Sequence, residues 1–297
     1  MAEIVGRRVL EAVIERLLWA CAAASVLVTV GIVGILAFEA IAFFGEVSPI
    51  AFLTGRTWTP LFRTQSFGVL PIVAGTLLVT IIAIAVAVPA GLISALYLSE
   101  YAPVQVRRVA KPALEVLAGV PTVVYGYFAL LFVTPWLRTW VPGLAGFNAL
   151  GPGLVMGLMI LPLVSSLCDD AFSAVPQGLR EGAFALGATR LQAAVGVVLP
   201  AAMSGVFAAV MLAISRAIGE TMIVAIAAGQ QPRLTANPLV PIETMTAYIV
   251  QVSLGDVPTG TREYRTIFAV GMLLFAATLA LNLCSDWLRR RMSRAAR

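Results

Sequence analysis

Long stretches without a charged side chain constrain the fold of this chain more than any other feature. Residues 17–38 and 67–98 contain no Asp, Glu, Lys or Arg, and each reaches the roughly 20 apolar residues with which an α-helix crosses a bilayer. Four further stretches are similarly apolar: residues 116–137, 150–167, 191–229 (interrupted by Arg216 and Glu220) and 266–285. Backbone amides in hydrocarbon must form their hydrogen bonds within the spanning segment. The sequence therefore predicts an all-α, polytopic membrane protein with six transmembrane helices.

The composition excludes several classes of enzyme. Charged residues make up only 12% of the chain, whereas a soluble domain carries about 25%. The sequence contains no histidine, so neither a Ser-His-Asp triad nor a histidine metal site can form. Cys21, Cys168 and Cys284 lie far apart in apolar surroundings, unlike the cysteines of a disulfide framework or a zinc cluster. We expect no catalytic residue, no metal and no cofactor.

The distribution of Lys and Arg predicts the orientation of the six helices, because cytoplasmic loops carry an excess of positive charge. The first apolar stretch exceeds the ~7 to 15 residues of a signal peptide, so we interpret it as an uncleaved helix. Cytoplasmic termini place thirteen cations inside: Arg7, Arg8, Arg16, Arg107, Arg108, Lys111, Arg180, Arg190, Arg289, Arg290, Arg291, Arg294 and Arg297. The outer side then receives six: Arg56, Arg63, Arg138, Arg233, Arg262 and Arg265. Both termini are therefore predicted to be cytoplasmic.

A cytoplasmic segment over residues 175–200 has the signals of a short helix beneath the membrane. Pro176 can start the helix, Glu181 lies near its positive end, and Gly187 can end it. One interpretation is an amphipathic helix that lies on lipid headgroups. The segment has only two cations, Arg180 and Arg190, and many small residues, which favours close contact with another protein.

The same segment resembles a motif of the permease subunits of ABC importers. That motif is Glu-Ala-Ala, three residues, Gly, nine residues, Ile, one residue and Leu-Pro. This chain matches its spacing with Glu181, Gly182, Ala183, Gly187, Val197, Leu199 and Pro200, with Gly182 in place of Ala and Val197 in place of Ile. The resemblance implies a type I ABC importer permease fold in which these residues dock onto an ATPase. The only lysine, Lys111, is followed by proline, so this chain has no P-loop, and the ATPase must be a partner.

Other stretches resemble phosphate importer permeases of the Pst type, and more closely their C-type subunit. These stretches are residues 118–126, 161–162, 169–170, 174–176, 215–221 and 237–249. The resemblance implies a phosphate path shared with a homologous A-type permease subunit, ATP-binding cassette ATPase subunits, a periplasmic phosphate-binding protein and a place in the bacterial inner membrane. It implies no nucleic-acid partner. We expect one permease domain over residues 1–297, with its core at 67–288 and its coupling segment at 175–200, while residues 1–66 carry no such resemblance.

Arg216 is the residue that chemistry singles out within the apolar stretches. A charged arginine in a transmembrane helix costs roughly 2.5 to more than 10 kcal/mol, so it needs a partner or a water-filled path. Glu220 follows at the i+4 position, on the same face of a continuous helix. The two side chains could simply neutralise one another, or Arg216 could offer its planar fork to an oxyanion. The resemblance favours the second alternative and implies a substrate path that includes Arg216, Glu220 and Thr221.

Three other functions remain as alternatives. The chain could serve an importer of another oxyanion, such as sulfate or molybdate. It could be an ATP-independent channel or carrier, which would not need the motif at residues 181–200. An intramembrane enzyme would need clustered polar groups, and the paired carboxylates Asp169 and Asp170 are expected to be solvated or to cap a helix rather than to catalyse a reaction.

Overall fold

A computed structural model describes the backbone of residues 2–295 and the side chains of residue 11 and residues 13–288. Over this part of the chain the protein is helical and contains no β-strand. Four helices are long and apolar enough to cross a membrane, and six spans result if two bent helix pairs each count as one. The predicted all-α architecture is therefore confirmed. Several arginines used to orient the chain lie outside the described side chains: Arg7, Arg8, Arg289, Arg290, Arg291, Arg294 and Arg297.

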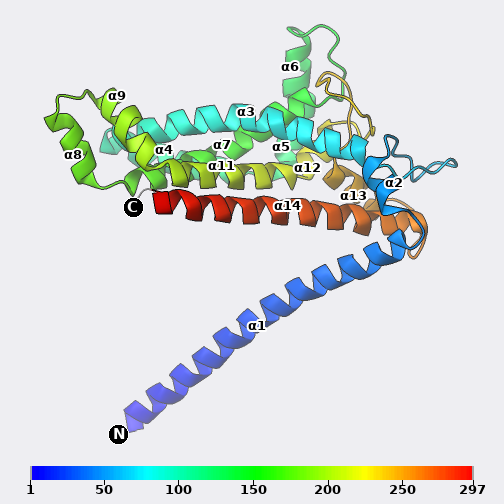
Figure 1. Ribbon diagram of the computed structural model, residues 1–297, viewed down its shortest axis with the longest axis horizontal. Coiled ribbons are helices and arrows are strands. Elements are labelled where there is room, and N and C mark those ends of the chain that lie inside the picture. The colour runs from blue at the N-terminus through cyan, green and yellow to red at the C-terminus, as the bar shows by residue number, and fades with distance from the viewer. Residues whose placement is uncertain (1, 296–297) are drawn as a thin grey trace.

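The first helix, α1 (Ala2–Phe44), diverges from the rest of the molecule (Figure 1). It meets α14 (Arg262–Ala295) only near its carboxyl end, where Arg265 forms ion pairs with Glu39 and Glu46 at 3.5 and 3.2 Å. Most of its described apolar side chains are exposed. The start of α1 and the end of α14 both lie toward the end of the molecule that carries α8 and α9 (Figure 1).

The centre of the molecule is the parallel pair α3 (Leu70–Glu100) and α7 (Leu150–Ser173), against which α11 (Met203–Ile218) packs. Its core contains many small buried side chains, including Ala83, Ala87 and Ala213. Small side chains allow membrane helices to approach closely. Pro89 and Pro162 lie inside α3 and α7 without ending them.

Two of the predicted spans are not single helices. The span expected at 116–137 begins instead with α4 (Val104–Ala118), which meets α5 (Thr122–Phe128) at an angle of 86°. A π-helical turn and α6 (Thr134–Arg138) continue α5. The break lies at Gly119–Pro121, because proline restricts the residue before it to extended conformations and glycine is a poor helix former.

The span expected at 191–229 is broken twice. It begins with α9 (Arg190–Ala193), a π-helical turn and α10 (Leu199–Ala201), and this piece meets α11 at 71°. The chain leaves helical structure again after Ile218 and resumes as α12 (Met222–Ala227). Helix α8 (Gln177–Ala185) connects α7 with α9. The expectation of one continuous helix over 191–229 is therefore wrong.

The opposite end of the molecule is closed by α2 (Pro49–Thr54), α13 (Met245–Leu254) and the segment that precedes α13. An aromatic cluster holds them together, in which the rings of Trp58 and Tyr248 are 4.9 Å apart and both are buried. The segment before α13 packs tightly on α3, since a Cβ atom added to Gly75 would lie 2.1 Å from the carbonyl oxygen of Glu243.

Replacing Gly75 with Ala is expected to destabilise the fold. A backbone carbonyl cannot move aside as a flexible side chain can, so we expect a cost of about 1–3 kcal/mol, typical of overpacking, or more. Gly31→Ala in α1 is the matched control, because a Cβ atom there meets nothing within 4 Å and alanine favours a helix. Thermal unfolding in detergent should show a lower midpoint for Gly75→Ala only. Equal midpoints for both variants would exclude this tight contact.

Candidate functional site

The break between α11 and α12 carries the charged residues that the sequence singled out. Arg216 lies in the last turn of α11, its side chain is exposed, and it lines two hollows of about 530 and 470 Å³. Within the described part of the chain, its guanidinium forms no hydrogen bond or ion pair. Arg216 therefore presents a free fork of donors to these two hollows, the arrangement expected of a functional arginine in a membrane protein.

The expected pairing of Arg216 with Glu220 on one helical face is wrong. Helix α11 ends at Ile218 and Gly219 leaves it, so the i+4 relation does not apply to Glu220. The Glu220 carboxylate is buried and accepts a hydrogen bond from the backbone N–H of Met222 at 3.2 Å, at the start of α12. Thr221, also predicted on the path, donates its hydroxyl to the carbonyl of Gly219 at 3.2 Å. Both residues thus shape the break.

Polar residues from two other elements support this break. Thr246 donates its hydroxyl to the backbone carbonyl of Glu220 at 2.7 Å, and the backbone N–H of Met245 donates to Thr76 Oγ1 at 3.0 Å. Thr76 belongs to α3, so the first turn of α13 is fixed both to α3 and to the break. Unwound backbone is tolerated at membrane depth where protein groups satisfy it.

Glu243 lies in the segment just before α13, outside the candidate spans, and is 2% exposed. Within the described chain, its Oε1 atom has no hydrogen-bond partner. Burial raises the pKa of the Glu243 carboxyl to about 8, because the charged form is disfavoured away from water. The protonated carboxyl is therefore the stable form in the folded protein.

Glu243→Gln is expected to remove a pH dependence of stability. A carboxyl whose pKa is higher in the folded state makes the fold lose stability as pH rises from its ordinary pKa, 4.5, to about 8. A shift of this size corresponds to at most roughly 5 kcal/mol. Thermal unfolding between pH 5 and pH 9 should show a falling midpoint for the natural protein and a smaller fall for Glu243→Gln. The control Glu181→Gln, at an exposed carboxylate, should show the same fall of the unfolding midpoint with pH as the natural protein. The same fall in Glu243→Gln would contradict the prediction.

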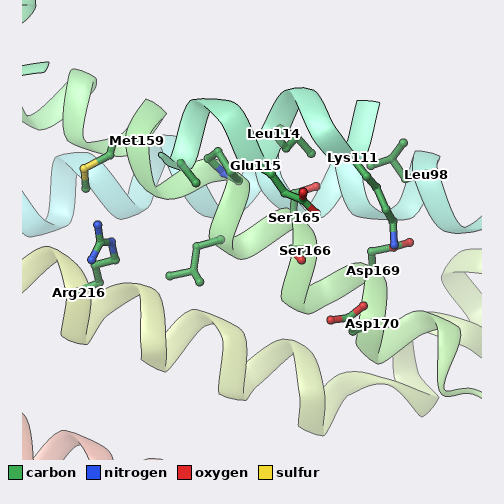
Figure 2. A pocket seen from close by; sticks show the side chains of 13 residues that line it. Leu98, Lys111, Leu114, Glu115, Met159, Ser165, Ser166, Asp169, Asp170 and Arg216 are labelled. Atoms are coloured by element: carbon green, nitrogen blue, oxygen red, sulfur yellow. The ribbon is translucent and has the colours of Figure 1, made fainter. Parts of the chain in front are cut away.

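The larger of the two hollows beside Arg216, of about 530 Å³, is a cavity between α3, α4, α7 and α11 (Figure 2). Arg216 and Met159 lie at one end of it, and Lys111, Asp169 and Asp170 at the other, with Glu115, Ser165 and Ser166 between them (Figure 2). Cationic and hydroxyl donors along one cavity can interact with an oxyanion. The carboxylates Glu115 and Asp170 limit how strongly the cavity attracts anions.

Asp169 differs from its expected role. It is 1% exposed, and it forms ion pairs with Arg107, at 3.1 Å, and with Lys111. It therefore joins α7 to α4 instead of being solvated or capping a helix, because a buried carboxylate needs cationic partners. The spacing of Arg107 and Lys111, four residues apart on a helix, could have indicated a shared partner, but nothing local pointed to Asp169.

The segment 175–200 begins with the short helix that was expected, which is α8. Ala188 N–H donates to Ala183 O at 3.0 Å and Gly187 N–H to Phe184 O at 2.9 Å, a Schellman motif in which Gly187 has φ +84°. Thr189 and Gln192 then form a capping box at the start of α9. Gly182 and Pro200 are exposed, Leu199 is half-buried and Ala183 is buried. Glu181 is exposed, and its carboxylate forms no hydrogen bond or ion pair with another described residue.

Among the described side chains, no group of three or more Cys, Asp or Glu residues could hold a metal ion.

Comparisons with known proteins assign the chain to a family. The sequence matches the family described as "Binding-protein-dependent transport system inner membrane component" over residues 87–297. The probable ABC transporter permease protein YqgH of Bacillus subtilis is 34% identical over 271 residues, which cover 91% of this chain and 86% of that protein. The phosphate transport system permease protein PstC of Mesorhizobium japonicum is 33% identical over 297 residues, covering 91% of this chain and 88% of that protein.

Solved structures show the same fold. A chain of a bacterial alginate ABC transporter aligns with a TM-score of 0.62 and 16% identity, over 93% of this chain and 94% of that chain. A chain of the MetNI methionine ABC transporter, inward facing, aligns with a TM-score of 0.55 and 19% identity, over 76% of this chain and 94% of that chain. These alignments confirm the predicted ABC importer permease fold. Together with the family match over more than half of the sequence, they show that the chain belongs to the inner membrane components of binding-protein-dependent transport systems.

Proposed function

We propose that this chain is the permease subunit of an ATP-driven phosphate importer in a bacterial inner membrane. The observation that carries the proposal is the unpaired guanidinium of Arg216, which faces a cavity at a broken helix. Several relatives named phosphate transport system permease proteins, at 31–33% identity, support phosphate as the substrate. The fold itself is shared by transporters of other substrates, so the substrate is argued from the site and the relatives.

In this proposal, Arg216 is a transient binding site for phosphate on the path. Its planar fork suits two oxygens of an oxyanion, while the buried Glu220 nearby offsets part of its charge. Conduction needs a site that attracts the ion without trapping it, so a single arginine is better suited than a pocket of several cations. Phosphate released from Arg216 enters the cavity that ends at Lys111 and Asp169. High-affinity selection then belongs to a periplasmic phosphate-binding protein.

ATP hydrolysis is the task of separate ATP-binding cassette subunits, which dock on α8. Glu181, Gly182, Ala183, Gly187, Leu199 and Pro200 form the coupling segment in this proposal. The exposed carboxylate of Glu181 and the exposed side chains of Phe184 and Leu186 provide a surface for that contact. Closure of the ATPase pair then moves α8 and switches the path between outward and inward access.

The remaining assignments complete the transporter. A homologous A-type permease subunit completes the path, and both termini face the cytoplasm, as the excess of Lys and Arg on that side favours. Residues 1–297 form one permease domain, with its core at residues 67–288.

An uptake assay tests the function. The chain is produced together with its genetic neighbours in cells that lack phosphate, sulfate and molybdate uptake, and accumulation of each labelled oxyanion is measured. We expect accumulation of phosphate that stops when ATP is depleted. Accumulation of sulfate or molybdate instead would reassign the substrate, and ATP-independent uptake would indicate a channel or carrier.

A further inference from the structure

Two neighbouring residues of α8, Arg180 and Glu181, have different surroundings. Glu181 is exposed, whereas the side chain of Arg180 is only 11% exposed and lies against the membrane helices. Arg180 Nη2 and Nε both donate to Oε1 of Glu100, at 3.1 and 3.3 Å. Glu100 is the last residue of α3, and its side chain is also 11% exposed.

The same guanidinium holds the end of α7. Arg180 Nη2 donates to the carbonyl of Phe172 at 2.7 Å, and Nη1 donates to the carbonyl of Val175 at 2.5 Å. Phe172 lies in the last turn of α7, where helix carbonyls have no partner within the helix. Since a guanidinium is planar and rigid, these contacts fix α8 relative to the ends of α3 and α7.

Other arginines of this region do not make such contacts. Arg107 and Arg190 line the same hollow as Arg180 and Glu100, a space of about 630 Å³. Arg107 pairs with Asp169, and the exposed Arg190 forms no ion pair within the described chain. Of these three arginines, only Arg180 joins α8 to both α3 and α7.

We propose that Arg180 is a positioning residue that couples the movement of α8 to α3 and α7, with Glu100 as its partner. This inference rests on the proposed function and specifies which contact carries the movement. Glu181 provides the outer contact with the ATPase, and Arg180 provides the inner contact with the spans that line the cavity. When the inner contact is lost, the ATPase stays bound and still hydrolyses ATP, but the spans no longer follow α8.

The test uses the whole transporter in proteoliposomes, with retention of the ATPase, ATP hydrolysis and phosphate uptake measured on one preparation. The variants are Arg180→Gln and Glu100→Gln, with Arg190→Gln as the matched control. For Arg180→Gln and Glu100→Gln we expect retained ATPase and an increase of about tenfold in the ATP hydrolysed per phosphate transported, within the usual range for loss of coupling between two sites. Arg190→Gln should keep the natural ratio.

A covalent link provides a second readout that a merely structural role would not change. In a variant with serine at the three natural cysteines, Glu100→Cys and Arg180→Cys are joined by a short bismaleimide. Joining them should return the ATP hydrolysed per phosphate transported close to the natural value, whereas the double variant without the link should remain uncoupled. Three results would each overturn the inference. The first is that Arg180→Gln and Glu100→Gln hydrolyse as much ATP per phosphate transported as the natural protein. The second is that both variants lose the ATPase, and the third is that the link restores nothing. If the natural complex itself neither binds an ATPase nor takes up phosphate, it is the proposed function that fails.

Discussion

Arg216→Gln is expected to abolish phosphate uptake while the complex still assembles and hydrolyses ATP. Glutamine keeps a polar side chain of similar length but loses the charge and the fork. Each hydrogen bond to a charged group contributes about 1.5–3 kcal/mol, so loss of the two bonds made by the fork should reduce uptake by at least about a hundredfold. Because no described residue pairs with Arg216, its replacement leaves no partner unsatisfied within the chain, and the fold should survive.

The controls separate transport from stability. Arg63→Gln, at an exposed arginine of the segment before α3, should leave uptake unchanged. Glu220→Ala should be less stable, since the buried Glu220 accepts a hydrogen bond at the start of α12 that alanine cannot accept. Normal uptake by Arg216→Gln would show that the arginine is not on the path. Loss of assembled complex from the same variant would show that its role is structural.

Deletion of residues 181–187 is expected to release the ATPase and to stop uptake altogether. The deletion removes the exposed face of α8 and the Schellman motif that positions the following turn. Co-purification of the ATPase with the permease measures docking, and size-exclusion chromatography of the permease checks that it remains folded. Glu181→Ala should produce a weaker loss of docking. A channel would still conduct after the deletion, so persistent phosphate flux would contradict the importer assignment.

The sequence predicted the uninterrupted spans well. Residues 17–38, 150–167 and 266–285 all lie within single long helices, as does the stretch 67–98 from Leu70 onward, because a run of apolar residues without a break is satisfied only by a helix in hydrocarbon. Residues 116–137 and 191–229 are equally apolar, but backbone breaks near Pro121 and Gly219 divide them. Hydrophobicity reports membrane depth and is insensitive to such local bends.

The site was predicted only where a single residue carried the signal. Arg216 was found because a charge in an apolar stretch is rare and costly. Its relation to Glu220 was predicted wrongly, since it assumed a continuous helix. The pair of Asp169 with Arg107 and the hydrogen bond from Thr246 to the Glu220 carbonyl join residues far apart in the chain. Such contacts depend on how helices pack, which one sequence does not encode locally.

The most direct test is accumulation of radiolabelled phosphate in proteoliposomes that contain this chain with its partner permease, ATPase and binding protein. We predict accumulation against a concentration gradient that requires ATP and the binding protein and is lost in Arg216→Gln. Accumulation that proceeds without ATP, or that persists at the natural rate in Arg216→Gln, would contradict an ATP-driven phosphate path through Arg216.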